Sequence, residues 1–417
     1  MTLNRGVMAI CAAQACAQIG AFAVAALLPT LIAVWSLSNT EAGWISGIYY
    51  AAYTLVVPLL SSLTDRVDPK RVYLASVALT AIAFAGFAWI ATGFWSALAF
   101  RALMGAGWAG SYMPGLKALS DLAEGAQQSR AVAAHAAAVG VSGALSFGVA
   151  GAVNAWLGWQ WALVPGALGA ALAFVLVLLA LPARPPVASA SPRGALLDFR
   201  PILRNRSALA YSIAYCVHTW EMSALRGWVV AFLTFVAVQR PGAWTPLAPA
   251  TVASVMGLLG VWASVWGNEL AIRFGRRRFI LGTMLASAAM AGVVGFGASL
   301  PYAAAVLLVL GYAVLIWSDS SSLTAGSAGS AEPGRRGATL AVHSTLGYAG
   351  GFLGPLALGA MLDLLGGASV RAWGIAFGHV SVVLLAGTLV FVWLRPADLA
   401  GDRGAARRPV AGTATGG

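Results

Sequence analysis

Charged side chains are scarce in this sequence of 417 residues, where aspartate, glutamate, lysine and arginine together account for 9%. A soluble domain carries about 25%, so the chain lacks the polar residues that cover a water-facing surface. Cysteine is also rare, and Cys11, Cys16 and Cys216 all lie in apolar stretches. Such thiols predict neither a disulfide framework nor a metal cluster. These shortages exclude a soluble enzyme, a disordered chain and a disulfide-stapled secreted domain.

Apolar residues take the place of the missing charge, at 60% of the sequence and with a mean hydropathy of +0.82. They gather in stretches that are each long enough to cross a lipid bilayer as a helix, which takes about 20 residues. The first stretch is too long for the apolar part of a signal peptide, so we expect a retained helix. The predicted helices are 6–34, 42–61, 71–92, 95–117, 130–154, 159–181, 207–238, 248–271, 278–298, 302–326, 337–362 and 372–394. The sequence therefore predicts an all-α polytopic membrane protein with twelve transmembrane helices.

The longest polar break inside the chain separates the sixth predicted helix from the seventh and contains adjacent prolines and several arginines. It divides the helices into two groups of six, and the polar residues after the last helix have little to pack against. The predicted units are an N-terminal lobe at 1–181, a cytoplasmic linker at 182–206, a C-terminal lobe at 207–394 and a disordered cytoplasmic tail at 395–417.

The two predicted lobes resemble each other in their glycines. Gly140 and Gly143 in the fifth span recur at the same spacing as Gly347 and Gly350 in the eleventh. The first pair also forms a G-x-S-G motif with Ser142, as in some intramembrane hydrolases, but its repeat lacks the serine. Close helix packing is therefore the preferred interpretation of these glycines. A duplication of six spans is the arrangement of a two-lobed transporter.

Positive charge exceeds negative charge, with 25 lysine and arginine residues against 13 aspartate and glutamate residues. Nearly all of the basic residues fall in breaks on one side of the predicted membrane, and only Arg240 and Arg371 fall on the other. This asymmetry follows the positive-inside rule. It predicts a multi-pass protein of the plasma membrane, the inner membrane in a bacterium, with both termini in the cytoplasm. The positive excess then reflects topology, and no nucleic-acid partner is expected.

Four ionisable residues lie well inside the predicted spans: Arg101, Glu221, Arg226 and Asp319. A charge at this depth is costly unless it faces water or a partner, so we interpret these residues as a functional site. Glu221 and Asp319 are candidate proton carriers, because a carboxyl group loses its charge by binding a proton. His218 lies on the same helix face as Glu221 and would relay the proton. The structural alternative is a set of ion pairs, Arg226–Glu221 or Arg101–Asp319, that only hold the lobes together.

The two arginines inside the spans are also candidates for binding an anionic substrate group. Polar and aromatic side chains on the same spans share the helix faces that would line a cavity. The predicted substrate and cavity residues are Gln14, Gln18, Arg101, Trp108, Tyr112 and Arg226.

Two of the basic breaks carry related motifs. Residues 61–71 read SSLTDRVDPKR, with an Asp65-Arg66 pair and a basic end, and residues 268–277 read NELAIRFGRR, with Ile272 in place of the acid. The fourth span carries R-x-x-x-G-x-G, beginning at Arg101. With these motifs, the sequence resembles the major facilitator superfamily over nearly its whole length.

This resemblance implies a secondary transporter with two pseudo-symmetric six-helix lobes that works by alternating access. In the family, spans 1, 4, 7 and 10 line the central cavity, and the four ionisable residues fall on this set. The resemblance also implies a conformational latch, in which Asp65 at the end of the second helix binds the N-terminus of the eleventh. The basic residues assigned to the same latch are Arg66, Arg71, Arg273, Arg276 and Arg277.

The expected function is transport driven by an ion gradient and not by ATP, because no nucleotide-binding loop occurs. No enzymatic activity is expected. Protons are the expected coupling ion, since titratable acids occupy the predicted cavity. We expect no cofactor, no metal and a functional monomer in the bilayer. The expected substrate is a small anion; the alternative is a proton-driven exporter of amphipathic drugs or metabolites. A transport-inactive sensor and an intramembrane hydrolase remain as further alternatives.

Overall fold

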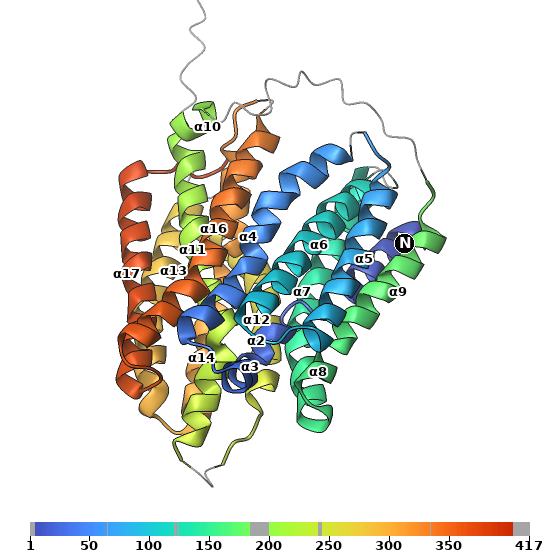
Figure 1. Ribbon diagram of the computed structural model, residues 1–417. Coiled ribbons are helices and arrows are strands. Elements are labelled where there is room, and N and C mark those ends of the chain that lie inside the picture. Colours follow the sequence, from blue (N-terminus) through green and yellow to red (C-terminus); the bar gives the residue numbers. More distant parts are fainter. Residues whose placement is uncertain are drawn as a thin grey trace, which may run out of the picture.

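The computed structural model describes residues 5–64, 66–120, 122, 125–183, 200–240, 244–333 and 335–402. Within these residues every regular element is a helix. The helices form one bundle, and the chain passes back and forth between its two ends (Figure 1). We call the end at which α1 begins and α17 ends the arginine-rich end of the bundle.

The first half of the chain builds one group of helices, which lies to the right in Figure 1. These helices are α1 (Arg5–Gln18), α2 (Ala23–Ala26), α3 (Leu28–Trp35), α4 (Asn39–Leu63), α5 (Pro69–Trp89), α6 (Phe94–Ser120), α7 (Gly125–Leu157), α8 (Trp159–Ala162) and α9 (Val164–Ala180).

The second half builds the group to the left in Figure 1. Its helices are α10 (Arg200–Arg204), α11 (Arg206–Val238), α12 (Pro249–Phe274), α13 (Arg276–Phe296), the 3-10 helix Gly297–Ser299, α14 (Tyr302–Ser318), α15 (Ser320–Gly329), α16 (Arg336–Leu364) and α17 (Val370–Leu394).

Membrane-spanning segments account for most of this bundle. Eleven helical segments of the described residues are long and apolar enough to cross a membrane. α6 is not among them, although its 27 residues extend about 40 Å at 1.5 Å per residue. It carries Arg101, Lys117 and several glycines, and it packs between α4 and α5. The chain is thus an all-helical multi-pass membrane protein, with α6 at the position of the remaining predicted span.

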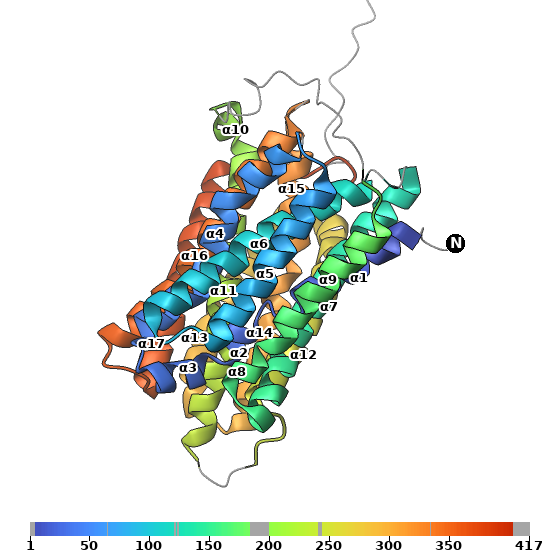
Figure 2. The ribbon, with the colours of Figure 1, turned by 45° about the vertical axis from the view of Figure 1, so that its right-hand side comes forward.

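The two groups of helices meet along two main seams. α4 packs against α16, and α7 packs against α12, each pair joining one half of the chain to the other (Figures 1 and 2). Glycine permits the close approach at both seams. A Cβ atom added to Gly47 would lie 2.5 Å from the carbonyl oxygen of Phe352, and one added to Gly257 would lie 2.7 Å from the Cβ of Ala144. Larger residues there would separate the lobes.

The first span is interrupted, although the sequence predicts one continuous helix over 6–34. α1 ends at Gln18 and α2 begins at Ala23. The turn between them frees backbone groups that side chains of other helices satisfy. The Arg101 guanidinium donates to the Ala21 carbonyl oxygen at 3.1 Å, and the Phe22 amide donates to the Ser146 hydroxyl at 3.0 Å. Such breaks are tolerated inside a membrane where the freed groups find partners.

The tenth span is interrupted as well. α14 ends at Ser318, Asp319 forms a turn with backbone angles in the helical region, and α15 begins at Ser320. Interrupted spans mark substrate and ion sites in many transporters, because they expose backbone and side-chain polar groups near the midplane. Both breaks adjoin the interface between the lobes, so a functional site is expected at that interface.

The C-terminal residues pack against the arginine-rich end. Residues 395–402 belong to the segment predicted to be a disordered tail, yet Asp402 forms a bidentate ion pair with Arg276, with both nitrogen–oxygen distances at 3.1 Å. Arg276 also donates to Asn268 and to the Ser322 carbonyl oxygen. Asp398 accepts from the backbone amide of Arg277 at 2.8 Å. The second loop motif, which lacks its own acid, is therefore neutralised by acids from the C-terminal segment.

The Arg276–Asp402 pair predicts a measurable loss of stability when it is broken. Both side chains are 3% exposed, so Asp402→Asn should lower the free energy of unfolding by about 3 kcal/mol by leaving a buried guanidinium unpaired. Unfolding of the purified protein in detergent measures this loss. The matched control is Glu332→Gln, which breaks the exposed Arg335–Glu332 pair and should cost less than about 1 kcal/mol. Equal losses in the two variants would contradict this reading of the C-terminal contact.

Candidate functional site

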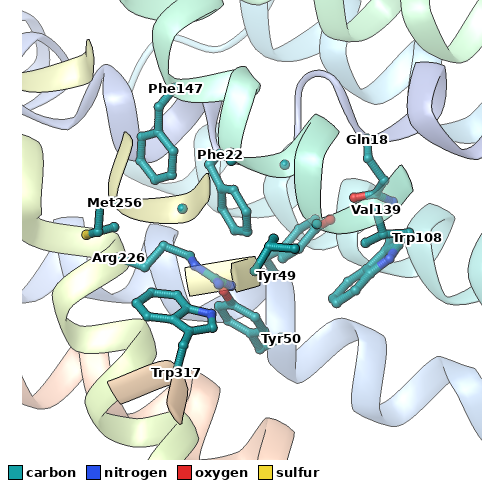
Figure 3. Close-up of a pocket in the computed structure, with 15 residues that line it drawn as sticks. Gln18, Phe22, Tyr49, Tyr50, Trp108, Val139, Phe147, Arg226, Met256 and Trp317 are labelled. Carbon is teal, nitrogen blue, oxygen red and sulfur yellow. The ribbon is translucent and has the colours of Figure 1, made fainter. Parts of the chain in front are cut away.

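A cavity of about 130 Å³ lies between the two lobes and is lined by residues from both (Figure 3). Its walls are mostly aromatic or small and apolar. The aromatic lining residues are Phe22, Tyr49, Tyr50, Trp108, Phe147 and Trp317. Besides the hydroxyl and indole N–H groups of these rings, Gln18 from the first lobe and Arg226 from the second contribute polar groups. The single charge in these apolar walls is the guanidinium of Arg226.

Arg226 is held by ring faces and not by a carboxylate. Its guanidinium carbon lies 4.5 Å from the ring centroid of Phe22 and 5.1 Å from that of Trp317. Figure 3 shows the side chain lying between these two rings, which come from the interrupted first and tenth spans. Among the described residues, no acidic side chain forms an ion pair with it. Cation–π contacts position the guanidinium and leave its donors available for an anion.

Arg101 lies close to the same space. It is 2% exposed, stacks 4.1 Å above the Tyr49 ring and donates to the Ala21 carbonyl oxygen at 3.1 Å. Its Nε has no hydrogen-bond partner among the described residues. A smaller adjoining cavity is lined by both arginines together with Ser46 and Ser223. Two guanidinium groups therefore border one region between the lobes.

The titratable residues form a second cluster beside this region. His218 Nδ1 lies 2.9 Å from Asp319 Oδ1, and both side chains are buried. The Tyr215 ring stacks on the His218 ring, with centroids 5.6 Å apart. Glu221 is buried one helical turn farther along α11, beside the hydroxyl groups of Tyr312 and Ser287. Of the predicted proton residues, His218 and Asp319 thus meet at the break between α14 and α15, and Glu221 lies beside α14 and α13.

The structural alternative of lobe-holding ion pairs is not observed. Within the described residues, Arg226 does not pair with Glu221, and Arg101 does not pair with Asp319. The basic partner of Asp319 is His218 instead. The anion-binding candidates and the proton-binding candidates are therefore separate groups.

The other predicted cavity residues divide between the cavity wall and the lobe interior. Gln18 and Trp108 line the cavity with Arg226. Gln14 instead accepts a hydrogen bond from the Tyr73 hydroxyl at 3.2 Å inside the first lobe. Tyr112 packs on His135, with ring centroids 5.4 Å apart, and lies outside the cavity wall.

The predicted latch is only partly within view. Asp65 lies outside the described residues. Arg66, Arg71 and Arg273 are exposed at the arginine-rich end, whereas Arg276 is buried against Asp402 within its own lobe. Arg277 is tied to the same C-terminal segment through its backbone amide.

An aromatic plug that sequence reasoning missed crosses between the lobes on the arginine-rich side of the cavity. It consists of Tyr53, Trp108 and Tyr348; the Tyr53 ring centroid lies 4.2 Å from that of Trp108 and 4.4 Å from that of Tyr348. Tyr53 follows the cavity-lining Tyr49 and Tyr50 by one turn of α4. Three tyrosines in the middle of an apolar span were the available signal, because their hydroxyl groups are costly in lipid.

A second missed contact closes the opposite end. The Asp363 carboxylate, at the end of α16, accepts from the backbone amides of Asn39 and Thr40 at 3.0 and 2.7 Å. It also accepts from the side chains of the same two residues at 2.8 and 2.6 Å. These residues begin α4, so a carboxylate of one lobe caps the positive helix end of the other. We call this contact the Asp363 latch.

The signal for the Asp363 latch was its position. An acid near the C-terminus of a helix is unfavourable for that helix's own dipole, and it therefore implies a partner elsewhere. Along α4, the order is the latch at Asn39, the cavity at Tyr49 and the plug at Tyr53. The cavity lies between these two contacts, as a site enclosed within a two-lobed protein would.

Comparison with known proteins gives a consistent assignment. A sequence model of the Major Facilitator Superfamily matches residues 10–250. Protein spinster homolog 1 of Homo sapiens is 26% identical over 271 residues, which make up 61% of this chain and 51% of that protein. The MFS-type transporter YfnC of Bacillus subtilis (strain 168), described as uncharacterized, is 37% identical over 110 residues, 26% of each chain. The chain spans about half the length of the spinster relatives that it matches.

Solved structures share the fold at low identity. A bacterial homolog to the human lysosomal transporter Spinster, in an inward-facing and occupied conformation, has a TM-score of 0.71 at 17% identity and is matched over 93% of this chain and 94% of that chain. A mutant of the nucleoside transporter NupG has a TM-score of 0.72 at 13% identity, over 94% of this chain and 100% of that chain. The bundle is therefore the two-lobed fold of these transporters.

The Asp363 latch predicts a shift in lobe opening. Asp363→Asn removes the charge and turns an amide donor toward the donors at the start of α4, so the closed arrangement should lose about 1–2 kcal/mol. In a cysteine-free background, the rate at which an impermeant maleimide modifies Ser46→Cys, in the small cavity nearest that end, should rise about tenfold.

Glu41→Gln is the matched control, because Glu41 caps the same helix end through Ser38 without touching the other lobe. It should leave the modification rate of Ser46→Cys unchanged. An equal rise in both variants would mean that helix fraying, and not lobe opening, controls access.

Proposed function

The chain belongs to the major facilitator superfamily, and from this premise we propose that it moves a small anion across the membrane, coupled to protons, by alternating access. Membership supports transport through a site between two lobes. The residues of the cavity support the finer statements on substrate and coupling.

Arg226 is the observation that carries the anion proposal. A cation within a membrane protein is costly without a counter-charge, and the aromatic rings beside it compensate only part of that cost. A bound carboxylate or phosphate would supply charge-assisted hydrogen bonds to the free donors. Since Phe22 belongs to one lobe and Trp317 to the other, an anion bound at Arg226 would favour closure of the lobes around it.

The coupling proposal follows from how the charges share elements. His218, Glu221 and Arg226 follow one another along α11, while Asp319 comes two residues after Trp317 at the break of the tenth span. A proton on Glu221 or on the His218–Asp319 pair would offset the charge of an incoming anion. Binding at either site would then favour binding at the other, as linkage requires.

The same geometry supports a definite orientation. We place the arginine-rich end in the cytoplasm by the positive-inside rule, so the Asp363 latch closes the opposite, external side. The protein would work as a monomer in the inner membrane, since each chain contains both lobes and the cavity between them.

The alternative substrate class, amphipathic drugs or metabolites, is favoured by the aromatic lining, because flat apolar molecules stack well on such rings. The hydrolase alternative receives no such support. The Ser142 hydroxyl donates to the Ala15 carbonyl oxygen at 2.5 Å, which is a packing role, and no described histidine bonds to it. A sensor without transport is separated from a transporter by measuring flux.

Anion uptake into proteoliposomes tests the substrate proposal. With an imposed pH gradient, small anions should accumulate and cationic dyes should not. Arg226→Gln should weaken anion binding about 10- to 100-fold, the worth of hydrogen bonds to a charged group, whereas Arg226→Lys should retain part of it. The control is Arg240→Gln, which removes an exposed arginine bonded to the Ser299 carbonyl oxygen. Dye transport without anion transport would favour the alternative class.

Uphill transport tests the coupling proposal. Glu221→Gln or Asp319→Asn should abolish accumulation against a gradient, because the neutral amide binds no proton, while anion exchange at equal concentrations continues. Glu332→Gln, at the exposed arginine-rich end, is the control and should behave like the unchanged protein. Full uphill transport in both Glu221→Gln and Asp319→Asn would show that protons are carried elsewhere.

A further inference from the structure

The size of the cavity limits what it can enclose. Alternating access requires that the bound solute be enclosed at one stage of the cycle, and the space between the Asp363 latch and the aromatic plug is about 130 Å³. A cavity of about 150 Å³ holds one benzene molecule. A single ring fills this space, so its charged group would extend into the adjoining cavity that Arg101 and Arg226 line, and a second ring or a long chain would require the site to widen.

The walls favour a flat ring over a hydrated inorganic ion. Ring faces of both lobes surround the space, and the α7 wall is flat because Gly140 and Gly143 lack side chains. A Cβ atom at Gly143 would lie 3.0 Å from Cε2 of Phe22, so even alanine would crowd that ring. Aromatic rings attract another ring in stacked or edge-on arrangements. An inorganic anion would lose its hydration shell here and regain few hydrogen bonds.

Donor groups without a partner border the two cavities, and the acceptors that border them, such as the amide oxygen of Gln18, are uncharged. Trp108 Nε1, Arg101 Nε and the Ser46 hydroxyl are buried without a hydrogen-bond partner among the described residues, and Arg226 is free of acids. No aspartate or glutamate lines either of the two cavities. This set suits a group that only accepts hydrogen bonds, such as an ionised carboxylate. It disfavours protonated amines, because no described carboxylate lines either cavity to balance their positive charge.

The geometry points to a monocyclic aromatic carboxylate as the substrate, with its carboxylate on Arg226 and its ring in the space that Phe22, Trp108 and the glycines of α7 border. This inference rests on the proposed anion transport and narrows it. The ring supplies the apolar contact, and the carboxylate supplies the counter-charge that Arg226 lacks. The same arrangement accounts for an arginine and six aromatic side chains in one small cavity.

Binding to the purified protein tests the inference with probes that differ in one property each. Benzoate should bind at least about tenfold more tightly than acetate, which lacks the ring, and than benzamide, which lacks the charge. It should also bind at least about tenfold more tightly than 2-naphthoate, which exceeds the cavity. Calorimetric titration or quenching of tryptophan fluorescence gives the Kd values.

A cavity variant makes the size limit testable within the same fold. Val261→Ala removes two methyl groups from the α12 wall. It should lower the ratio of the 2-naphthoate Kd to the benzoate Kd about tenfold. Val265→Ala, an exposed valine one turn along the same helix, is the matched control and should leave the ratio unchanged. Thermal unfolding identifies any variant that fails to fold. In that case Gly140→Ala serves as the second variant, because it reduces the cavity and should weaken benzoate binding.

The outcomes separate this inference from the proposal beneath it. If acetate binds as tightly as benzoate, or 2-naphthoate binds more tightly, the aromatic class is wrong while anion transport stands. If no anion binds and a cationic dye does, the anion proposal itself fails. A preference for benzoate over benzamide that disappears in Arg226→Gln supports both the aromatic carboxylate and the anion proposal.

Discussion

The cost of placing a charge inside an apolar bundle governs this structure. Most charged side chains avoid that cost by lying at the arginine-rich end. The few that lie elsewhere or are buried are stabilised by different kinds of contact. Arg276 is neutralised by Asp402, Asp319 lies against His218, and Asp363 caps a helix of the other lobe. Arg226 and Arg101 instead lie against ring faces and pair with no acid among the described residues. The proposed function follows from these two residues, because a guanidinium inside the bundle without an acid is a candidate site for an anion.

The interrupted helices deliver these charges to one place. The break after Gln18 turns Phe22 toward Arg226, and the break at Asp319 brings its carboxylate to His218 while Trp317 covers the guanidinium. Two continuous helices would keep their backbone polar groups satisfied internally and would offer neither contact. The Asp363 latch and the aromatic plug are also small contacts. One carboxylate on one side of the cavity and three aromatic rings on the other link α4 to α16. Small changes at these contacts can therefore shift the balance between open and closed lobes.

Much of the architecture could be predicted from the sequence, because hydropathy and arginine placement act over whole segments. The four ionisable residues inside the spans were identifiable for the same reason, since their cost depends on depth alone. The break in the first span was not, because no proline or polar run marks it, and the polar run at 318–322 marks the tenth span without showing that its helix is interrupted. The first break depends on distant partners, such as Arg101 for the Ala21 carbonyl and Ser146 for the Phe22 amide. Part of the aromatic wall was also hidden, since Phe22 and Phe147 look like ordinary residues of an apolar span until the helices are placed.

Coupling between the free arginine and the buried acids is the central claim, and proton uptake on binding tests it most directly. An anion that the protein binds, such as benzoate, is titrated into purified protein in a weakly buffered detergent solution while the pH is recorded. The account predicts that protons are taken up as the anion binds, and that this uptake is lost in a variant in which Glu221 and Asp319 are both replaced by amides. If the unchanged protein and the double variant both bind the anion and take up the same number of protons, the account is contradicted.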